Sequence, residues 1–249
     1  SRLCRAADLV VATTREIADD LAWRYGIGED RLAVVPNYIL QGDAPSAVER
    51  DPNLVLLAGR LVHQKRADRL LDAVSRLPAD MRQSVTVSII GGGPLESELK
   101  EQASRLGVRA VFEPRIPHEQ LVDRMRRCGV YVQTSSYEGH PKTVIEAMSV
   151  GAPVLLASAP GLTGIVTHGL TGLCVSPEPE SLALALEGLL AEPRWGLSLG
   201  HAAAEQARQA YGLDAIITLE CAAYSRALSH AKSRAEGADH SRSVKWAPD

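Results

Sequence analysis

Residues 85–106 read VTVSIIGGGPLESELKEQASRL, and this stretch decides the fold. It begins with a largely apolar run, continues through three consecutive glycines, and takes on a helical pattern from Pro94 onward. Such apolar runs are typical of strands that are covered on both faces of a parallel sheet. The stretch therefore predicts a strand, a tight turn and a helix that returns along the sheet.

The same alternation of apolar run and helical pattern recurs from one end of the chain nearly to the other. The expected strands are residues 9–12, 32–35, 54–58, 85–90, 110–112, 130–133, 153–156 and 173–175. The expected helices are residues 15–25, 66–77, 94–106, 118–127, 141–150, 180–191, 195–209 and 214–229. This order predicts an α/β fold, in which a partial βαβ unit precedes a Rossmann-like parallel sheet flanked by helices.

A segment rich in proline, glycine and small residues, residues 41–52, is expected to link these two parts. Residues 1–42 then form the end of one domain with its linker, and residues 43–230 form a complete second domain. A lone βαβ unit cannot bury its own sheet, so we expect the chain to be part of a longer one with a partner domain upstream. Residues 231–249 are polar and aperiodic, which predicts a disordered tail.

The composition is that of a folded, soluble protein. The 249 residues are 45% apolar and 23% charged, close to the average of globular domains. The 27 basic and 30 acidic side chains leave a net charge of −3, so we expect no nucleic-acid partner. The uncharged stretch between Glu146 and Glu178 is interrupted by prolines and glycines, which predicts buried core and excludes a membrane span.

The four cysteines stand far apart and include no CxxC pair. This pattern is typical of reduced thiols in the cytoplasm, so we expect a cytoplasmic protein. The cysteines are Cys4, Cys128, Cys174 and Cys221.

The first candidate motif is AGRLVHQK, residues 58–65, at the end of an expected strand. Ligands of open α/β sheets bind at this edge. Gly59 lets the backbone approach a ligand, Arg60 can grip phosphate oxygens, and Lys65 can add a point charge. The alternative is a solvated basic pair at the start of a helix. We expect His63 to be exposed and without a role.

The second candidate is the glycine run, Gly91 to Gly93, followed by Pro94. Backbone amides at the start of a helix can bind an anion. Because the run is not a complete GxGxxG motif, a turn that only packs the helix on its strand is the favoured interpretation.

The third and most specific candidate is SSYEGHPKTVIEAM, residues 135–148. Gly139 and Pro141 break the chain, so Glu138 belongs to the loop after a strand and Glu146 to the second turn of a helix that begins near Pro141. One site then offers two carboxylates for hydroxyl groups, and the amides of about residues 142–144 for phosphate. The alternative is that Glu138 caps the loop and Glu146 pairs with an arginine.

Taken in order, these motifs resemble the C-terminal half of a family 4 retaining glycosyltransferase of the GT-B fold. The resemblance covers about residues 1–230 and includes VPN at residues 35–37 and HGLTGL at residues 168–173. Glu138 and Glu146 match the E-x7-E pattern of that family. The resemblance implies a UDP-sugar or GDP-sugar donor with no cofactor and no metal, and no DxD triplet occurs in the sequence.

The resemblance also implies a role for each matched residue. Arg60, Lys65 and the amides after Pro141 would hold the diphosphate, and the loop at Arg115 and Ile116 would face the base. Glu146 would bond the ribose hydroxyls, and Glu138 would contact the transferred sugar. Catalysis then falls to Glu138, Arg60 and Lys65. The whole expected donor-binding set is Gly59, Arg60, Lys65, Arg115, Ile116, Glu138, Gly139, His140, Pro141, Lys142, Thr143, Val144 and Glu146.

Two features depart from the family pattern. Where the family commonly has a glutamate in a GGxxE stretch, residues 161–165 read GLTGI, without a carboxylate. The acceptor-binding N-terminal domain is represented only by a likeness of residues 1–40 to its last βαβ unit.

The sequence thus indicates the donor-binding half of a metal-independent, retaining glycosyltransferase. It would move a hexosyl group from a nucleotide-sugar donor to a glycan, lipid or small-molecule alcohol. The missing N-terminal domain would be its partner, and the resemblance allows that domain a peripheral association with the inner face of the cell membrane. Two alternatives stay open: a non-catalytic nucleotide-sugar-binding module, and another GT-B enzyme such as a sugar-nucleotide epimerase.

Overall fold

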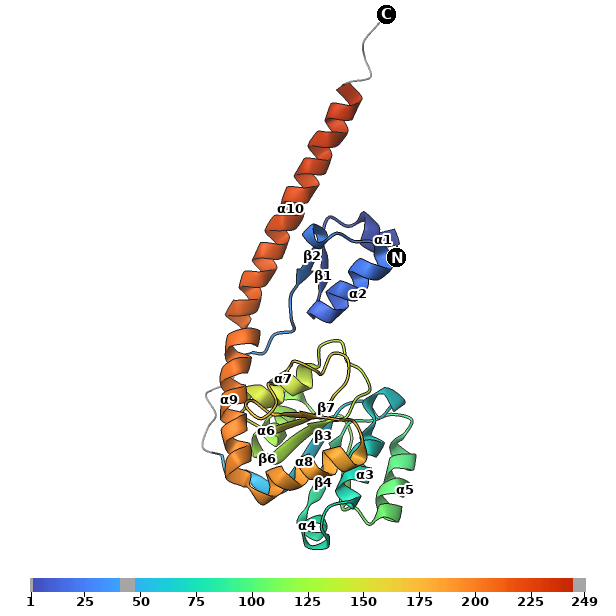
Figure 1. Ribbon diagram of the computed structural model, residues 1–249, viewed down its shortest axis with the longest axis vertical. Helices are drawn as coiled ribbons and strands as arrows, with labels where there is room; N and C mark the ends of the chain where they lie inside the picture. The colour runs from blue at the N-terminus through green and yellow to red at the C-terminus, as the bar shows by residue number, and fades with distance from the viewer. Residues whose placement is uncertain (1, 41–47, 244–249) are drawn as a thin grey trace, which may run out of the picture. The chain divides into compact units, whose positions relative to one another are not determined.

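The computed structural model describes residues 2–40 and 48–243 (Figure 1). The chain folds into two compact units. The larger unit is Tyr38–Gly212, and the smaller one combines the residues up to Asn37 with those from Leu213 onward. Residues 213–230, which the sequence assigns to the larger domain, group here with the smaller unit, in which Ile216 and Ala223 bury their side chains against Val35.

The larger unit is built on a six-stranded sheet in which all neighbouring strands are parallel. The strand order is β5-β4-β3-β6-β7-β8, so the chain builds outward from the central β3 in both directions. The strands are β3 (Asp51–Ala58), β4 (Thr86–Ile90), β5 (Ala110–Glu113), β6 (Cys128–Gln133), β7 (Val154–Ala157) and β8 (Leu173–Val175). The sheet order reverses between β3 and β6, where open α/β sheets place their ligands.

Helices cover both faces of this sheet (Figure 1). Val55 and Leu57 of β3 face a core shared with α3, α5 and α8, whereas Leu56 and Ala58 face a core shared with α6, α7 and α9. Alternate residues of a strand point to opposite faces, so a strand with both faces covered must be apolar throughout. The helices are α3 (Ala67–Ser75), α4 (Ala79–Ser84), α5 (Glu96–Leu106), α6 (His118–Arg127), α7 (Lys142–Ser149), α8 (Pro179–Ala191) and α9 (Pro193–Tyr211).

One partly buried arginine joins the C-terminal ends of two helices, α6 and α7. Arg50 donates to Met125 O at 2.9 Å at the end of α6 and to Val150 O at 2.7 Å just past α7. Helix C-termini carry unpaired carbonyls and partial negative charge, so a guanidinium satisfies both at once. Burial lowers the pKa of Arg50.

The smaller unit contains a two-stranded parallel sheet, in which Val10 of β1 (Val10–Ala12) lies opposite Leu32 of β2 (Leu32–Val34). The short α1 (Arg2–Ala6) precedes it, and α2 (Arg15–Tyr25) connects its strands. Helix α2 is capped by Thr14, whose hydroxyl accepts from the Ile17 amide. The final helix, α10 (Leu213–Ser243), also belongs to this unit.

The predicted fold class is confirmed, and every expected strand and helix is present, with bounds within a few residues except for the last helix, which extends to Ser243. The sequence missed the short helices α1 and α4. Most of the expected linker, residues 41–47, lies outside the described residues. Its last two residues, Asp51 and Pro52, are the first residues of β3. The expected tail is helical to Ser243, because it is rich in good helix formers and contains no proline before that residue.

The uncharged stretch after Glu146 folds into the end of α7 and the buried strand β7, as predicted. Within the described part of the chain, no helix is long and apolar enough to cross a membrane.

Candidate functional site

The carboxyl ends of β3, β4, β5 and β6 meet at one edge of the large sheet, and the loops that follow them form the candidate site. A cavity of about 540 Å³ lies there. It brings together five of the predicted site residues: Gly59, Arg60, Arg115, Ile116 and Thr143. These residues come from two loops, those after β3 and β5, and from the start of α7. The volume is in the range of ordinary small-molecule sites.

The glycine run borders this cavity and packs the β4 loop against the β3 loop. Gly91 has a φ of 138°, and a Cβ at this position would lie 2.0 Å from Gly59 O. The Gly59 amide donates to Ile90 O at 2.9 Å. The run therefore packs the backbones of the β4 and β3 loops closely together at the wall of the cavity, and the favoured interpretation, a turn that packs the helix on its strand, stays a prediction.

Glu138 is held by three donors on a single oxygen atom. Lys65 Nζ and Ser135 Oγ each lie 2.5 Å from its Oε1, and Gln133 Nε2 lies 3.0 Å away. The side chains of Lys65 and Glu138 are 16% and 8% exposed, so this ion pair is largely withdrawn from water. The structure thus joins two predicted site residues that stand 73 positions apart in the sequence.

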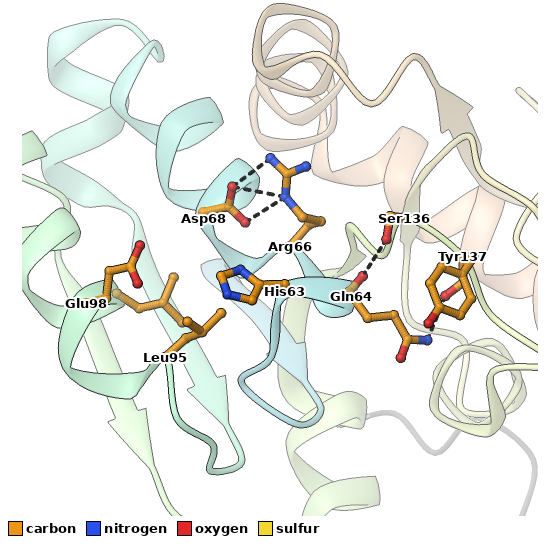
Figure 2. Close-up of a pocket in the computed structure, with 9 residues that line it drawn as sticks. His63, Gln64, Arg66, Asp68, Leu95, Glu98, Ser136 and Tyr137 are labelled. Atoms are coloured by element: carbon orange, nitrogen blue, oxygen red, sulfur yellow. Dashed lines mark hydrogen bonds and ion pairs between the residues drawn. The ribbon is translucent and has the colours of Figure 1, made fainter.

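The loops that carry Lys65 and Glu138 are also joined through their neighbours (Figure 2). Gln64 Nε2 donates to Tyr137 O at 2.9 Å, and Gln64 O accepts from the Ser136 amide at 2.8 Å. Thr134 Oγ1 donates to Lys65 O at 3.1 Å. These contacts fix the backbone on both sides of the ion pair.

The backbone of Glu138 is also held by the loop after β7, at Pro160 and Gly161. Its amide donates to Pro160 O at 2.9 Å. Gly161, with a φ of 76°, approaches so closely that a Cβ would lie 1.9 Å from Glu138 O. The GLTGI stretch therefore supplies backbone packing to the site although it lacks the carboxylate of the family pattern.

Glu146 lies on α7, as predicted, and is held differently. His118 Nε2 lies 2.9 Å from its Oε1, and Lys142 Nζ lies 4.0 Å from the same atom. The Glu146 side chain is 9% exposed, whereas that of His118 is 57% exposed. The alternative interpretation of the sequence paired Glu146 with an arginine. In the structure the partners of Glu146 are a histidine and a lysine.

The amides of residues 142–144 at the start of α7 are predicted to bind phosphate, and the Val144 amide has a partner inside the helix instead. Pro141 occupies the N-cap, and the Val144 amide donates to Pro141 O at 3.1 Å. Val144 is therefore engaged within the helix, because its amide already closes the first turn. The amides of Lys142 and Thr143 are the ones that a helix start leaves for a ligand.

The other predicted residues of this loop pack around α7. Burial lowers the pKa of His140, whose ring meets the Tyr211 ring edge-on at 5.2 Å. Lys142 Nζ lies 5.0 Å from the centre of the Tyr38 ring. Within the described residues, no three His, Cys, Asp or Glu side chains come together in a way that could hold a metal ion.

A second cavity, also of about 540 Å³, lies between the starts of α3 and α5 and the β6 loop (Figure 2). His63, Gln64 and Tyr137 line it, together with the ion pair of Arg66 and Asp68. His63 is exposed, as predicted. Arg66 has a φ of 50°, the only positive φ of a non-glycine residue in the described chain.

Sequence reasoning missed three residues that hold the two carboxylates, namely His118, Gln133 and Ser135. A signal existed for one of them. Gln133 is a polar residue at the end of an otherwise apolar run, and a polar side chain buried there needs partners.

An open parallel sheet with a glycine-rich turn, an exposed arginine and two buried carboxylates at its carboxyl edge is typical of a Rossmann-like domain that carries its candidate ligand site at that edge. Comparison with known proteins gives the family. Residues 43–210 match the family described as Glycosyl transferases group 1, and the chain belongs to it.

Relatives and solved structures agree with this assignment. The chain is 32% identical to D-inositol 3-phosphate glycosyltransferase of Streptomyces avermitilis, over 94% of this chain and 55% of that protein. It thus spans about half the length of the curated relatives it matches.

Two crystal structures have the same fold. TarM of S. aureus, solved with fondaparinux, α-GlcNAc-glycerol and UDP, superposes with a TM-score of 0.80 at 18% identity, over 89% of this chain and 44% of that one. HepE of Anabaena, solved with UDP and glucose, gives a TM-score of 0.74 at 22% identity, over 90% of this chain and 64% of that one.

Proposed function

We propose that this chain is the donor-binding part of a metal-independent, retaining glycosyltransferase that moves a hexosyl group from a UDP-sugar or GDP-sugar to an alcohol. The observation that carries the proposal is the convergence, at one sheet edge, of a cavity lined by Arg60 and of two buried, oriented carboxylates, Glu138 and Glu146. Cations suit a diphosphate, and fixed carboxylates suit sugar hydroxyls.

The cavity supports the roles assigned to the nucleotide part of the donor. Arg60 is exposed at the wall, and the structure finds no side-chain partner for it among the described residues, so its guanidinium can meet the diphosphate. Arg115 and Ile116 line the same cavity and would face the base. His118 lines this cavity together with Thr143, and its partner Glu146 would meet the ribose. The UDP in the related crystal structures favours uracil as the base.

The chemistry would be electrostatic. As the bond from the sugar carbon to the diphosphate breaks, negative charge grows on the leaving oxygen. Arg60, Lys65 and the first amides of α7 would stabilise that charge without a metal. Glu138 would hold a hydroxyl of the transferred sugar. The acceptor oxygen would form its bond on the face that the diphosphate leaves and give its proton to the leaving phosphate oxygen, which retains the configuration.

The acceptor is a glycan, a lipid or a small alcohol, and we propose that a partner domain outside these 249 residues supplies its binding surface. The name of the curated relatives makes D-inositol 3-phosphate the first acceptor to test. That partner domain would also carry any peripheral contact with the cell membrane. A non-catalytic nucleotide-sugar-binding module would need the same donor site without the acceptor, and an epimerase would convert the donor with no acceptor present.

Calorimetry with UDP and with GDP, each with and without EDTA, tests the donor site. We expect one nucleotide to bind, and the chelator to leave its affinity unchanged. Loss of all binding with EDTA would contradict the metal-free site, and no binding of either nucleotide under any condition would contradict the donor site itself.

A further inference from the structure

A buried amide at the end of β6 lies directly behind Glu138. Gln133 is 2% exposed, and its Nε2 lies 3.0 Å from Glu138 Oε1 and 2.8 Å from Ser135 Oγ. Its Oε1 lies 3.2 Å from the hydroxyl of Tyr131, a residue with no exposed surface. Every polar atom of the Gln133 side chain is thus satisfied inside the fold.

The direction of each hydrogen bond follows from the chemistry of the groups. A carboxylate only accepts, so the atom of Gln133 that faces Glu138 must be the amide nitrogen, and the amide oxygen must face Tyr131. The Tyr131 hydroxyl then donates to Gln133, and Gln133 donates to both Ser135 and Glu138. The Ser135 hydroxyl donates its own hydrogen bond to the same carboxylate oxygen.

This chain of bonds fills one oxygen of Glu138. With Lys65 included, three donors converge on Oε1, and in the described part of the chain the structure pairs none with Oε2. A carboxylate fixed in this way presents its second oxygen in one orientation. Burial makes the arrangement rigid, because a donor that let go would be left without a partner.

We propose that Gln133 is a positioning residue, which orients the Glu138 carboxylate so that Oε2 receives a hydroxyl of the transferred sugar. The proposal rests on the proposed function, because it takes the sugar contact of Glu138 from there. It assigns Gln133 to the sugar and not to the nucleotide, since none of the side-chain hydrogen bonds given for Gln133 goes to a residue that lines the Arg60 cavity.

The test uses Gln133→Met, which keeps the length of the side chain and removes its donor and acceptor. Calorimetry measures the dissociation constants of UDP, UDP-glucose and UDP-N-acetylglucosamine. The quantity compared is the ratio of the dissociation constant of each nucleotide sugar to that of UDP. We expect Gln133→Met to change the affinity for UDP by no more than about twofold. We expect it to raise the ratio for the preferred nucleotide sugar about tenfold, which is near the lower end of the free energy of a hydrogen bond to a charged group. Glu138→Ala should raise the ratio similarly, and the double variant should add nothing to Glu138→Ala.

Val132→Ala is the matched control. Val132 neighbours Gln133 on β6, has no exposed surface and faces the opposite core, so the variant weakens the same strand without touching Glu138. It should lower the melting temperature and leave the ratio unchanged. Should Gln133→Met fail to fold, Ser135→Ala removes another donor from the same oxygen and should raise the ratio in the same direction.

The outcomes separate the two proposals. A normal ratio in folded Gln133→Met, together with a raised ratio in Glu138→Ala, overturns the role of Gln133 and leaves the proposed function standing. A normal ratio in Glu138→Ala overturns the sugar contact itself, and the role of Gln133 with it.

Discussion

Glu138 and Glu146 are buried to nearly the same degree, 8% and 9% exposed, yet they are held in different ways. Glu138 receives three short bonds from the protein interior and from a second loop. Glu146 is held by His118, which is largely exposed, and more distantly by Lys142. One carboxylate is locked in place, and the other is held by side chains that water can replace.

The difference matches the two roles proposed for them. Transfer requires the acceptor oxygen within about 3–3.5 Å of the sugar carbon, so the group that holds the sugar must be rigid. A ribose contact adds affinity and tolerates small movements. The comparison predicts that changes near Glu138 have larger effects than changes near Glu146.

The largest expected effect is on transfer itself. Correct positioning of the acceptor oxygen and the sugar carbon can lower the activation barrier of transfer by roughly 7–11 kcal/mol. We expect these 249 residues alone to bind donor and to show no acceptor-dependent transfer above background. A radiolabelled-donor assay with D-inositol 3-phosphate checks this. Transfer that depends on both the acceptor and Glu138 would show that the acceptor site lies within this chain.

Lys65→Ala should have the next largest effect, because it leaves the Glu138 carboxylate buried without its cation. We expect a loss of about 3 kcal/mol in the free energy of unfolding, measured with urea, as for other broken buried pairs. Its control is Arg60→Ala, which removes an exposed cation. Arg60→Ala should lower UDP affinity by about 1.5–3 kcal/mol and leave unfolding nearly unchanged. Equal unfolding curves for both variants would contradict the locked arrangement.

Gly161→Ala tests the backbone behind Glu138. The added Cβ would meet Glu138 O at 1.9 Å and would strain a φ of 76°. We expect a loss of about 2 kcal/mol in stability and a weakened preference for the nucleotide sugar, with UDP binding kept. Gly164→Ala is the control, since it has a φ of 89° but no atom within 4 Å of an added Cβ. Similar results for the two would show that φ strain alone acts here.

The smallest expected effect belongs to His118→Ala. An exposed partner contributes little, so UDP affinity should fall about threefold, measured by calorimetry. Binding of 2′-deoxy-UDP should fall less, because the ribose contact is already reduced in that ligand. An effect as large as that of Lys65→Ala would mean that Glu146 is as firmly held as Glu138.

The sequence predicted the parts of this site that local patterns encode. Apolar runs predicted the six strands of the large sheet, and the breaks at Gly139 and Pro141 placed Glu138 in a loop and Glu146 on a helix. The pairing of Lys65 with Glu138 was not predictable, because it depends on how two loops 73 residues apart meet in space. The helical extension to Ser243 was missed because a polar composition suits an exposed helix as well as a coil.

The most direct test of the account is a crossed titration of two variants with two ligands. Glu138→Ala and Glu146→Ala are each titrated with UDP and with the nucleotide sugar that the unmodified chain prefers. We expect Glu146→Ala to weaken both ligands alike, because both contain the ribose, and Glu138→Ala to weaken only the nucleotide sugar. Equal effects of both variants on both ligands would contradict the division of roles between the two carboxylates.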